Sequence, residues 1–391
     1  MNPNHLHSKL FSRILLIKPS ALGDVVHTVP VLAKLRARYP HARIDWLITR
    51  ENAEIIRCHP ALSNAVIFPR RGFGKDWRTT TAMLGLLQQL RRAKYDLVID
   101  LHGQLRSIFF GLVTGCKTRI GFDRPGRRSA GEPRRGWRGA REGSWLAYTH
   151  RIPIPTLDVH AIDRYLWIAP MLGLDDAPPD GTLYLPPETA QRVDALLGRH
   201  GVAEPVAAIV PGTIWETKHW RVEGFADVAR YLISSGFSVV LLGVNRDRER
   251  CRQISAAVRG AHNLCGQTSP AELASILERA GICVTNDSGS MHLAVALRRP
   301  VVSIFGPTNP HTIGPYHREE SVVRLDLPCS PCNFRRLTQC PYDHRCMRDV
   351  SANMVIQRIE RELQSHDWAV KRRNSRLRHP TLNESSAGNL C

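Results

Sequence analysis

The sequence predicts an α/β fold built from two doubly wound parallel sheets. Short runs of apolar and β-branched residues alternate with stretches of helical periodicity, which is the pattern of consecutive βαβ units. The alternation occurs twice, once on each side of a segment rich in Pro, Asp and Gly. Polar turns follow several of the apolar runs, at the positions where a parallel sheet usually binds ligands.

The first half opens with a buried strand at 13–18, followed by a polar loop and a helix from Val25. Further elements are expected as strands at 42–48, 65–68 and 95–101 and as helices at 83–90 and 160–172. In the second half we expect strands at 206–210, 238–242, 282–285 and 301–305, and helices from 186, at 224–234, at 270–280 and from Ser290. These elements predict an N-terminal domain at 1–175, a linker at 176–188, a C-terminal domain at 189–370 and a disordered basic tail at 371–391. Two such halves predict a cleft between them that binds ligands.

An arginine-rich segment at 119–148 interrupts the alternation. It carries Arg124, Arg127, Arg128, Arg134, Arg135, Arg138 and Arg141. Such a run is commonly a solvated loop. We favour a mobile basic flap that contacts an anionic acceptor or lipid surface, because so long a loop rarely lacks a role. Trp137, Trp145 and Tyr148 either insert at a membrane interface or anchor the loop.

The charge balance predicts anionic partners. Lys and Arg number 54 against 35 Asp and Glu, a net charge of +19, which suits nucleic acid, an anionic membrane face or phosphorylated substrates. No apolar run reaches the roughly 18 residues that span a bilayer, and no signal peptide is recognisable. Ten cysteines without an export signal favour a reducing compartment, so we expect a cytoplasmic protein.

Four loops are expected at the carboxyl ends of strands, namely 20–24, 212–218, 243–249 and 287–292. In the first, Asp24 can act as a general base on a hydroxyl or cap the following helix, and spacing alone favours the cap. In the second, Thr213 and Lys218 offer a hydroxyl and a point charge to phosphate oxygens, whereas an ordinary surface lysine is the alternative.

The third loop offers Asp247 or Glu249 for the hydroxyls of a ribose, unless both are first-turn acids of a helix. The fourth belongs to Ile282–His292, where a strand, a polar turn and a helix start follow one another. Free amides at such a helix start suit a phosphate or diphosphate, and an ordinary βα turn is the alternative. Neither a Walker A sequence nor GxGxxG is present, so ATPase and dehydrogenase functions lose support.

The stretch KPSALGDVVHT at Lys18–Thr28 resembles the N-terminal signature of glycosyltransferase family 9, the ADP-heptose:lipopolysaccharide heptosyltransferases. The resemblance continues in the family's order at 218–220, 287–292 and 305–308, and covers the chain from about Arg13 to about Arg361. The opening loop and 44–46 are most similar to heptosyltransferase I, which adds the first heptose to Kdo.

The resemblance implies a GT-B fold of two Rossmann-like domains, the first binding the acceptor and the second the nucleotide-sugar donor. It implies inverting transfer of heptose from ADP-heptose to the Kdo-containing inner core of lipopolysaccharide, with a lipid A acceptor. It also implies that catalysis needs no cofactor. The enzyme would be peripheral on the cytoplasmic face of the bacterial inner membrane.

The resemblance also implies roles for individual residues. Asp24 matches the catalytic base and Lys218 the cation that neutralises the departing diphosphate. Donor binding falls to Thr213, Asp287, Ser288, Gly289 and His292, with looser matches at Asp247 and Thr268. Acceptor binding is expected at the turns of the first half, at Ser20, Gly23, His102, Gln104 and Arg106.

A cysteine-rich segment at 328–348 departs from the best-known heptosyltransferase I sequences. Cys329 and Cys332 form a CxxC pair that Cys340 and Cys346 follow, which is compatible with a structural zinc ion or iron–sulfur cluster. The second pair is not spaced CxxC, so buried free thiols are the alternative.

Two further functions compete with heptose transfer. The first is a glycosyltransferase of the same family that uses another sugar nucleotide as donor or another surface glycan as acceptor. The second is a basic nucleic-acid-binding protein whose arginines follow the phosphates. We favour the transferase over nucleic-acid binding, because four motifs occur in the family's order.

Overall fold

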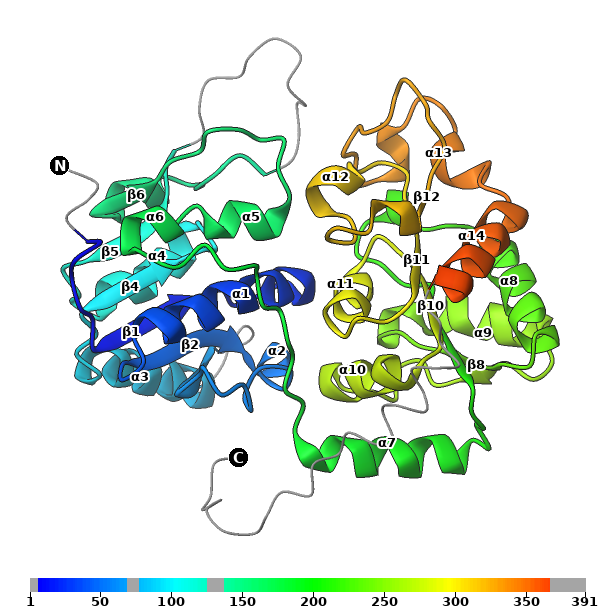
Figure 1. The fold of residues 1–391 in the computed structure, drawn as a ribbon, viewed down its shortest axis with the longest axis horizontal. Coiled ribbons are helices and arrows are strands. Elements are labelled where there is room, and N and C mark those ends of the chain that lie inside the picture. The colour runs from blue at the N-terminus through cyan, green and yellow to red at the C-terminus, as the bar shows by residue number, and fades with distance from the viewer. Residues whose placement is uncertain (1–5, 69–76, 125–136, 366–391) are drawn as a thin grey trace. The chain divides into compact units, whose positions relative to one another are not determined.

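The computed structural model describes residues 6–68, 77–124 and 137–365, with the side chains of 77–79 excepted. The chain divides into two compact units, Met1–Leu185 and Pro186–Cys391 (Figure 1). Each unit contains a six-stranded sheet of its own. Among the described residues, none of the helices is both long and apolar enough to cross a membrane.

The sheet of the first unit has the strand order β3-β2-β1-β4-β5-β6. Its strands are β1 (Arg13–Ile17), β2 (Arg43–Thr49), β3 (Asn64–Phe68), β4 (Leu97–Asp100), β5 (Arg119–Phe122) and β6 (His150–Ile152). Every neighbouring pair is parallel. Successive strands are added outward from β1 on one side and then from β4 on the other, so the β1/β4 junction is the topological switch point.

Helices of the first unit connect these strands. They are α1 (Leu22–Arg38), α2 (Arg50–Ala53), α3 (Trp77–Arg92), α4 (Leu105–Val113), α5 (Ala161–Leu166) and α6 (Ala169–Leu172), with a 3-10 turn, η2, at Ser144–Ala147. One core cluster joins Leu15 and Ile17 of β1, Val98 of β4 and Phe110 of α4. The sheet is therefore fixed at the strand ends from which the polar turns emerge.

The sheet of the second unit repeats this topology in the order β12-β11-β10-β7-β8-β9, with all pairs parallel. Its strands are β7 (Val206–Val210), β8 (Ser238–Leu241), β9 (His262–Asn263), β10 (Ile282–Asn286), β11 (Val301–Ile304) and β12 (Val322–Val323). The switch point lies between β7 and β10. The predicted α/β class with doubly wound sheets is confirmed in both halves.

The longer helices of the second unit are α7 (Pro187–Arg199), α8 (Val222–Ser234), α9 (Arg248–Ala257), α10 (Pro270–Arg279), α11 (Gly289–Ala296) and α14 (Ala352–Ser365). Shorter turns are η3 (Glu216–Lys218), η4 (Asn245–Asp247), α12 (Pro310–Ile313), η5 (Glu319–Ser321), η6 (Leu337–Gln339) and α13 (Arg345–Arg348). Trp220 is fully buried in the core of this unit, where its indole N–H donates to Val350 O at 3.0 Å.

Three local expectations differ from the structure. The first helix begins at Leu22 rather than Val25. The expected helix at 160–172 is two helices, because Pro170 has no N–H to continue a helix and instead occupies the first turn of α6. The arginine-rich segment begins as strand β5 and contains η2, while Arg127, Arg128, Arg134, Arg135 and the tail at 371–391 lie outside the described residues.

Candidate active site

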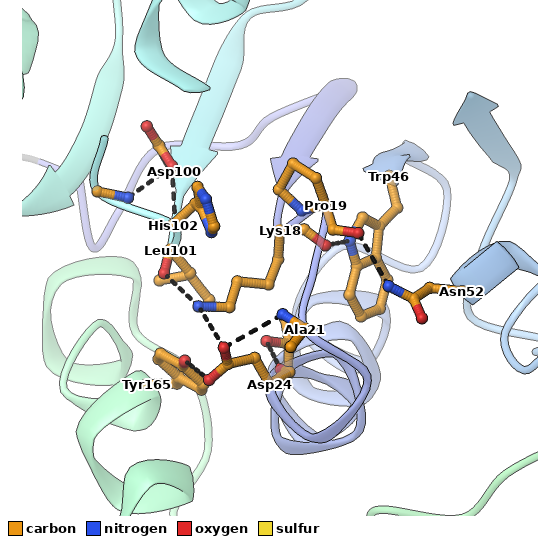
Figure 2. A network of polar contacts seen from close by, with 12 residues as sticks. Lys18, Pro19, Ala21, Asp24, Trp46, Asn52, Asp100, Leu101, His102 and Tyr165 are labelled. Atoms are coloured by element: carbon orange, nitrogen blue, oxygen red, sulfur yellow. Dashed lines mark hydrogen bonds and ion pairs between the residues drawn. The ribbon is translucent and has the colours of Figure 1, made fainter. Parts of the chain in front are cut away.

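A lysine–aspartate pair lies at the switch point of the first unit (Figure 2). Lys18 follows β1 directly and Asp24 is in the first turn of α1. The Nζ of Lys18 is 3.8 Å from Oδ2 of Asp24 and donates to Leu101 O, beyond the end of β4, at 3.1 Å. The hydroxyl of Tyr165, from α5, donates to Oδ1 of Asp24 at 2.9 Å. The carboxylate of Asp24 thus contacts its own segment through Lys18 and the distant helix α5 through Tyr165, while Leu101 holds Lys18.

The turn that carries this pair is anchored to β2 and its following helix. The indole N–H of Trp46 donates to Lys18 O at 3.1 Å, and the side-chain amide of Asn52 donates to Pro19 O at 3.1 Å (Figure 2). Both donors are buried. The backbone between β1 and α1 is therefore held in place while the side chain of Asp24 is left accessible.

Asp24 is not the N-cap of its helix. The N-cap is Ala21, and Asp24 is the third residue of the helix, where its Oδ2 accepts the Ala21 N–H at 3.3 Å. Burial acts to raise the pKa of Asp24, but Lys18, the Tyr165 hydroxyl and the Ala21 amide together hold this pKa below its ordinary value. With a side chain that is 42% exposed, Asp24 presents an ionised carboxylate to solvent and can accept a proton.

A second buried acid, Asp100, shapes the turn after β4. Its carboxylate accepts the backbone N–H groups of His102 and Gly103 at 2.9 and 3.1 Å. It also accepts the hydroxyls of Ser107 at 2.8 Å and Tyr148 at 2.9 Å. Burial raises the pKa of Asp100, and these four donors oppose that rise. Asp100 thereby fixes the turn that bears the expected acceptor contacts.

The expected acceptor residues occupy different positions around the switch point. His102 is half-buried, and burial together with the charge of Lys18 lowers the pKa of His102 to about 4, so its ring is neutral near pH 7. Ser20 and Gln104 are half-buried, whereas Gly23 is buried within α1. Arg106 is on the exposed surface of α4.

Lys18, Asp100 and Tyr165 were not among the predicted site residues. A lysine directly after a buried apolar strand and an aspartate at the end of another are visible in the sequence, and either could have been nominated. Tyr165 carries no comparable signal, because its proximity to Asp24 arises only when α5 packs on α1.

The second unit has its own lysine–aspartate pair at the switch point between β7 and β10. The Nζ of Lys218 is 2.6 Å from Oδ2 of Asp287, and both side chains are buried. The hydroxyl of Thr308 donates to the same carboxylate oxygen at 2.6 Å. The hydroxyl of Thr213 donates to Asp287 O at 3.0 Å. Two predicted donor-binding residues, Thr213 and Asp287, are therefore in one cluster with the predicted cation Lys218.

Helix α11 begins beside this cluster. Ser288 is its N-cap residue but makes no capping hydrogen bond, and its hydroxyl is 3.0 Å from that of Thr285 instead. Ser288 and Gly289 are half-buried, while His292 is buried one turn further along the helix. The first amides of α11 consequently have no partner within the helix and can bind an anion.

Of the two acids in the third loop, Asp247 is at the edge of the sheet and Glu249 is not. Asp247 is buried, and its Oδ2 accepts the Val244 N–H at 3.0 Å. Its carboxylate packs so closely on the backbone that a Cβ at Gly212 would be 2.3 Å from Asp247 Cγ. Glu249 pairs with Arg252 on the surface of α9 at 2.7 Å.

Glu249 instead lines a pocket of about 410 Å³, together with Arg248, Arg252, Asn263, Cys265 and Gln267. Thr268, the loosely matched donor residue, is half-buried and directly follows this lining in the sequence.

The four cysteines at 329–346 do not form a metal site in the described part of the chain. No group of three or more His, Cys, Asp or Glu side chains is placed to hold an ion among the described residues. Cys329, Cys332 and Cys340 are half-buried, and Cys346 is buried. Burial, followed by the neighbouring Cys332, Cys340 and Cys329, raises the pKa of Cys346 to about 12, so the four thiols interact electrostatically.

Known proteins resemble this chain over most of its length. The sequence profile of glycosyltransferase family 9 (heptosyltransferase) matches residues 83–342. Lipopolysaccharide heptosyltransferase 1 of Pseudomonas aeruginosa is 33% identical over 335 residues, covering 84% of this chain and 88% of the relative. A family 9 glycosyltransferase from Veillonella parvula superposes with a TM-score of 0.76 at 22% identity, covering 90% of this chain and 98% of the other. Escherichia coli heptosyltransferase WaaC, solved with ADP-2-deoxy-2-fluoro heptose, superposes with a TM-score of 0.65 at 24% identity. This match covers 89% of this chain and 99% of the other.

Proposed function

Because the chain belongs to glycosyltransferase family 9, we propose that it transfers heptose from ADP-heptose to the Kdo-containing inner core of lipopolysaccharide. Membership of the family makes the chain a glycosyltransferase, and the fold is of the GT-B type. The observation that carries the finer proposal is the similarity to a heptosyltransferase 1 over 84% of the chain. A related fold solved with a fluorinated ADP-heptose supports the choice of donor.

In the proposed reaction Asp24 is the general base. The acceptor hydroxyl oxygen attacks the anomeric carbon of the heptose, while the bond from that carbon to the diphosphate oxygen breaks and its electron pair leaves with ADP. The hydroxyl proton passes to Asp24. Attack opposite the leaving group inverts the anomeric configuration. The lowered pKa of Asp24 keeps this carboxylate ionised and ready to accept the proton across the neutral range.

Lys218 and the first turn of α11 are proposed to stabilise the departing diphosphate. In the structure Asp287 neutralises Lys218, so a bound diphosphate would share or displace this partner. The first amides of α11, which have no partner within the helix, add a second source of positive potential. These groups supply the charge stabilisation that the leaving group needs, and we propose that catalysis requires no cofactor.

The rest of the donor is assigned to the carboxyl edge of the second sheet. Asp247 is proposed to accept hydrogen bonds from the ribose hydroxyls. Its carboxylate packs against Gly212, the residue before Thr213. Thr268 would border the nucleotide next to the pocket after β9. Ser288, Gly289 and His292 would hold the diphosphate from the start of α11. These residue roles are proposals that rest on the family motifs and on this shared sheet edge.

The acceptor is assigned to the first unit. Its Kdo sugars carry carboxylates, and Lys18 provides a buried cation beside Asp24. Arg106, on the exposed surface of α4, follows the His102–Gln104 turn. Ser20 lies in the turn after β1, Gly23 in the first turn of α1, and His102 and Gln104 in the turn after β4. The net charge of +19 supports a cytoplasmic enzyme that is peripheral on the inner membrane, where a lipid-linked acceptor is found.

A transfer assay with a small panel of nucleotide sugars and Kdo-lipid A tests this function. ADP-heptose should be the preferred donor. Asp24→Asn, which keeps the size of the side chain, should abolish transfer while leaving ADP binding intact, because the base acts on the acceptor. Transfer from a different nucleotide sugar, and none from ADP-heptose, would show that the proposed donor is wrong. Full turnover by Asp24→Asn would show that Asp24 is not the general base.

The cysteine segment carries a separate proposal, namely that Cys329, Cys332, Cys340 and Cys346 hold a structural zinc ion or iron–sulfur cluster. In its support, Cys329 and Cys332 form a CxxC pair that Cys340 and Cys346 follow in the sequence. Among the described residues, these four side chains are not close enough together to form a set of metal ligands. Metal analysis of the purified protein decides it, with Cys329→Ser as the test and Cys116→Ser as the control. A wild-type protein without stoichiometric metal would end the proposal.

A further inference from the structure

Helix α4 exposes an apolar face next to the candidate acceptor site. Leu105, Phe109 and Leu112 lie at i, i+4 and i+7, and they are 55%, 47% and 46% exposed. Leu146 of η2, which contacts α4, is 75% exposed. We call Leu105, Phe109, Leu112 and Leu146 the α4 surface.

This face is unusual for a surface helix. The opposite side of α4 is already buried in the core through Ile108 and Phe110. A helix on the surface of a soluble domain normally turns polar residues outward. In α4 the outward residues are apolar, with Arg106 as the one charged residue of the helix. Single exposed leucines need no explanation, but an apolar row along one helix indicates a partner.

Cations border the α4 surface. Arg106 is exposed on the helix itself, and the N–H of Arg141 donates to Gly103 O at 2.8 Å, which places Arg141 beside the start of α4. Arg151 follows η2, donates to Trp145 O at 3.0 Å and pairs with Asp123 at 3.8 Å. A second acid, Glu142, accepts the Leu105 N–H, the first amide of the helix, at 3.1 Å. Apolar side chains bordered by arginines suit the interface of an anionic bilayer.

The α4 surface is also continuous with the candidate acceptor site. The turn His102–Gln104, which Asp100 holds, leads directly into Leu105. A bilayer in contact with α4 would therefore lie next to the turn assigned to the acceptor. We propose that the chain docks on anionic phospholipid through the α4 surface. The choice of a bilayer rests on the proposed function, because a lipid-linked acceptor is presented at a bilayer surface.

Vesicle binding by the full chain tests this proposal. Wild-type protein should cosediment with vesicles of phosphatidylcholine and phosphatidylglycerol, and far less with phosphatidylcholine alone or at high salt. The double variant Phe109→Ser/Leu112→Ser should reduce the bound fraction at least tenfold. Leu337→Ser/Tyr342→Ser is the matched control, because these residues are 48% and 55% exposed in the second unit. Thermal unfolding checks that both variants are folded.

A transfer assay separates docking from chemistry. The α4 double variant should lose activity toward an acceptor embedded in anionic vesicles and keep it toward the same sugar freed of its lipid. Vesicle binding can be measured without turnover, so a failure of the proposed function leaves the docking test intact. Unchanged binding of the double variant to anionic vesicles would overturn the proposal. So would a wild-type dimer that this variant dissociates, because a second copy would then cover the α4 surface.

Discussion

Removing the charge of Lys18 should change the pH at which the enzyme loses activity. Lys18→Met keeps most of the side-chain volume and removes the cation 3.8 Å from Asp24. That cation favours the ionised form of Asp24 and lowers the pKa of this carboxyl. Without it, Asp24 should take up its proton at a higher pH. Because a protonated Asp24 cannot act as a base, the acid limb of kcat/KM should move to higher pH.

The size of this change follows from the distance and the exposure. Two unit charges 3.8 Å apart attract by about 1 kcal/mol in water and by about 4 kcal/mol at an effective dielectric constant near 20. Because the side chain of Asp24 is 42% exposed, solvent screens the pair, and we take the lower figure. Because one pKa unit corresponds to about 1.4 kcal/mol, the acid limb of kcat/KM should move to higher pH by about 0.8 pH units.

The assay is kcat/KM for transfer, measured across the acid range at constant ionic strength. Lys34→Met is the matched control, because it removes the same charge from α1, where Lys34 pairs with Asp175 at 2.6 Å. The control should leave the acid limb in place. An unmoved or downward limb for Lys18→Met would refute the electrostatic link between Lys18 and Asp24. Equal shifts in both variants would point to a general effect of net charge.

Three further predictions follow from the geometry. Asp100→Asn has a side chain with a single acceptor oxygen for four donors, so the free energy of unfolding should fall by about 2 kcal/mol, and an unchanged denaturant midpoint would contradict this. Gly212→Ala should weaken ADP binding and lower the free energy of unfolding by about 1–3 kcal/mol, because the added Cβ would overlap Asp247. The control Gly198→Ala adds a Cβ in open space on α7 and should raise the free energy of unfolding by up to about 1 kcal/mol. Lys218→Met should reduce ADP affinity in calorimetry at least tenfold, and wild-type affinity would exclude Lys218 from the diphosphate site.

The sheet architecture was predictable because parallel strands buried on both faces are nearly continuous apolar runs. Strands β1, β4, β7 and β10, which form the two switch points, are of this kind. Strand β5 was missed within the arginine-rich segment. Of the edge strands, β3 was predicted at 65–68, whereas β6, β9 and β12 were missed, since β9 and β12 are two residues each and β6 only three. So short a strand leaves no periodic pattern in the sequence.

The candidate site was predictable where it is local in sequence. Asp24 and the Asp287–His292 turn each follow a strand within a few residues, so the pattern of the strand locates them. Partners that arrive from elsewhere could not be found this way. Tyr165 reaches Asp24 across 141 positions, and Thr308 reaches Asp287 across 21. These contacts depend on how the helices and strand ends pack, which a single sequence does not display.

The self-contained hydrogen-bond ladders of the two sheets have an evolutionary consequence. Every strand from β1 to β6 comes from residues before Leu185, and every strand from β7 to β12 from residues after Pro186. Among the described residues, neither sheet contains a strand from the other side of this boundary. Recombination near Leu185 would thus exchange the whole first unit without breaking a hydrogen-bond ladder in the second. If the first unit binds the acceptor as proposed, chimaeras of this kind would combine a new acceptor specificity with an unchanged second unit.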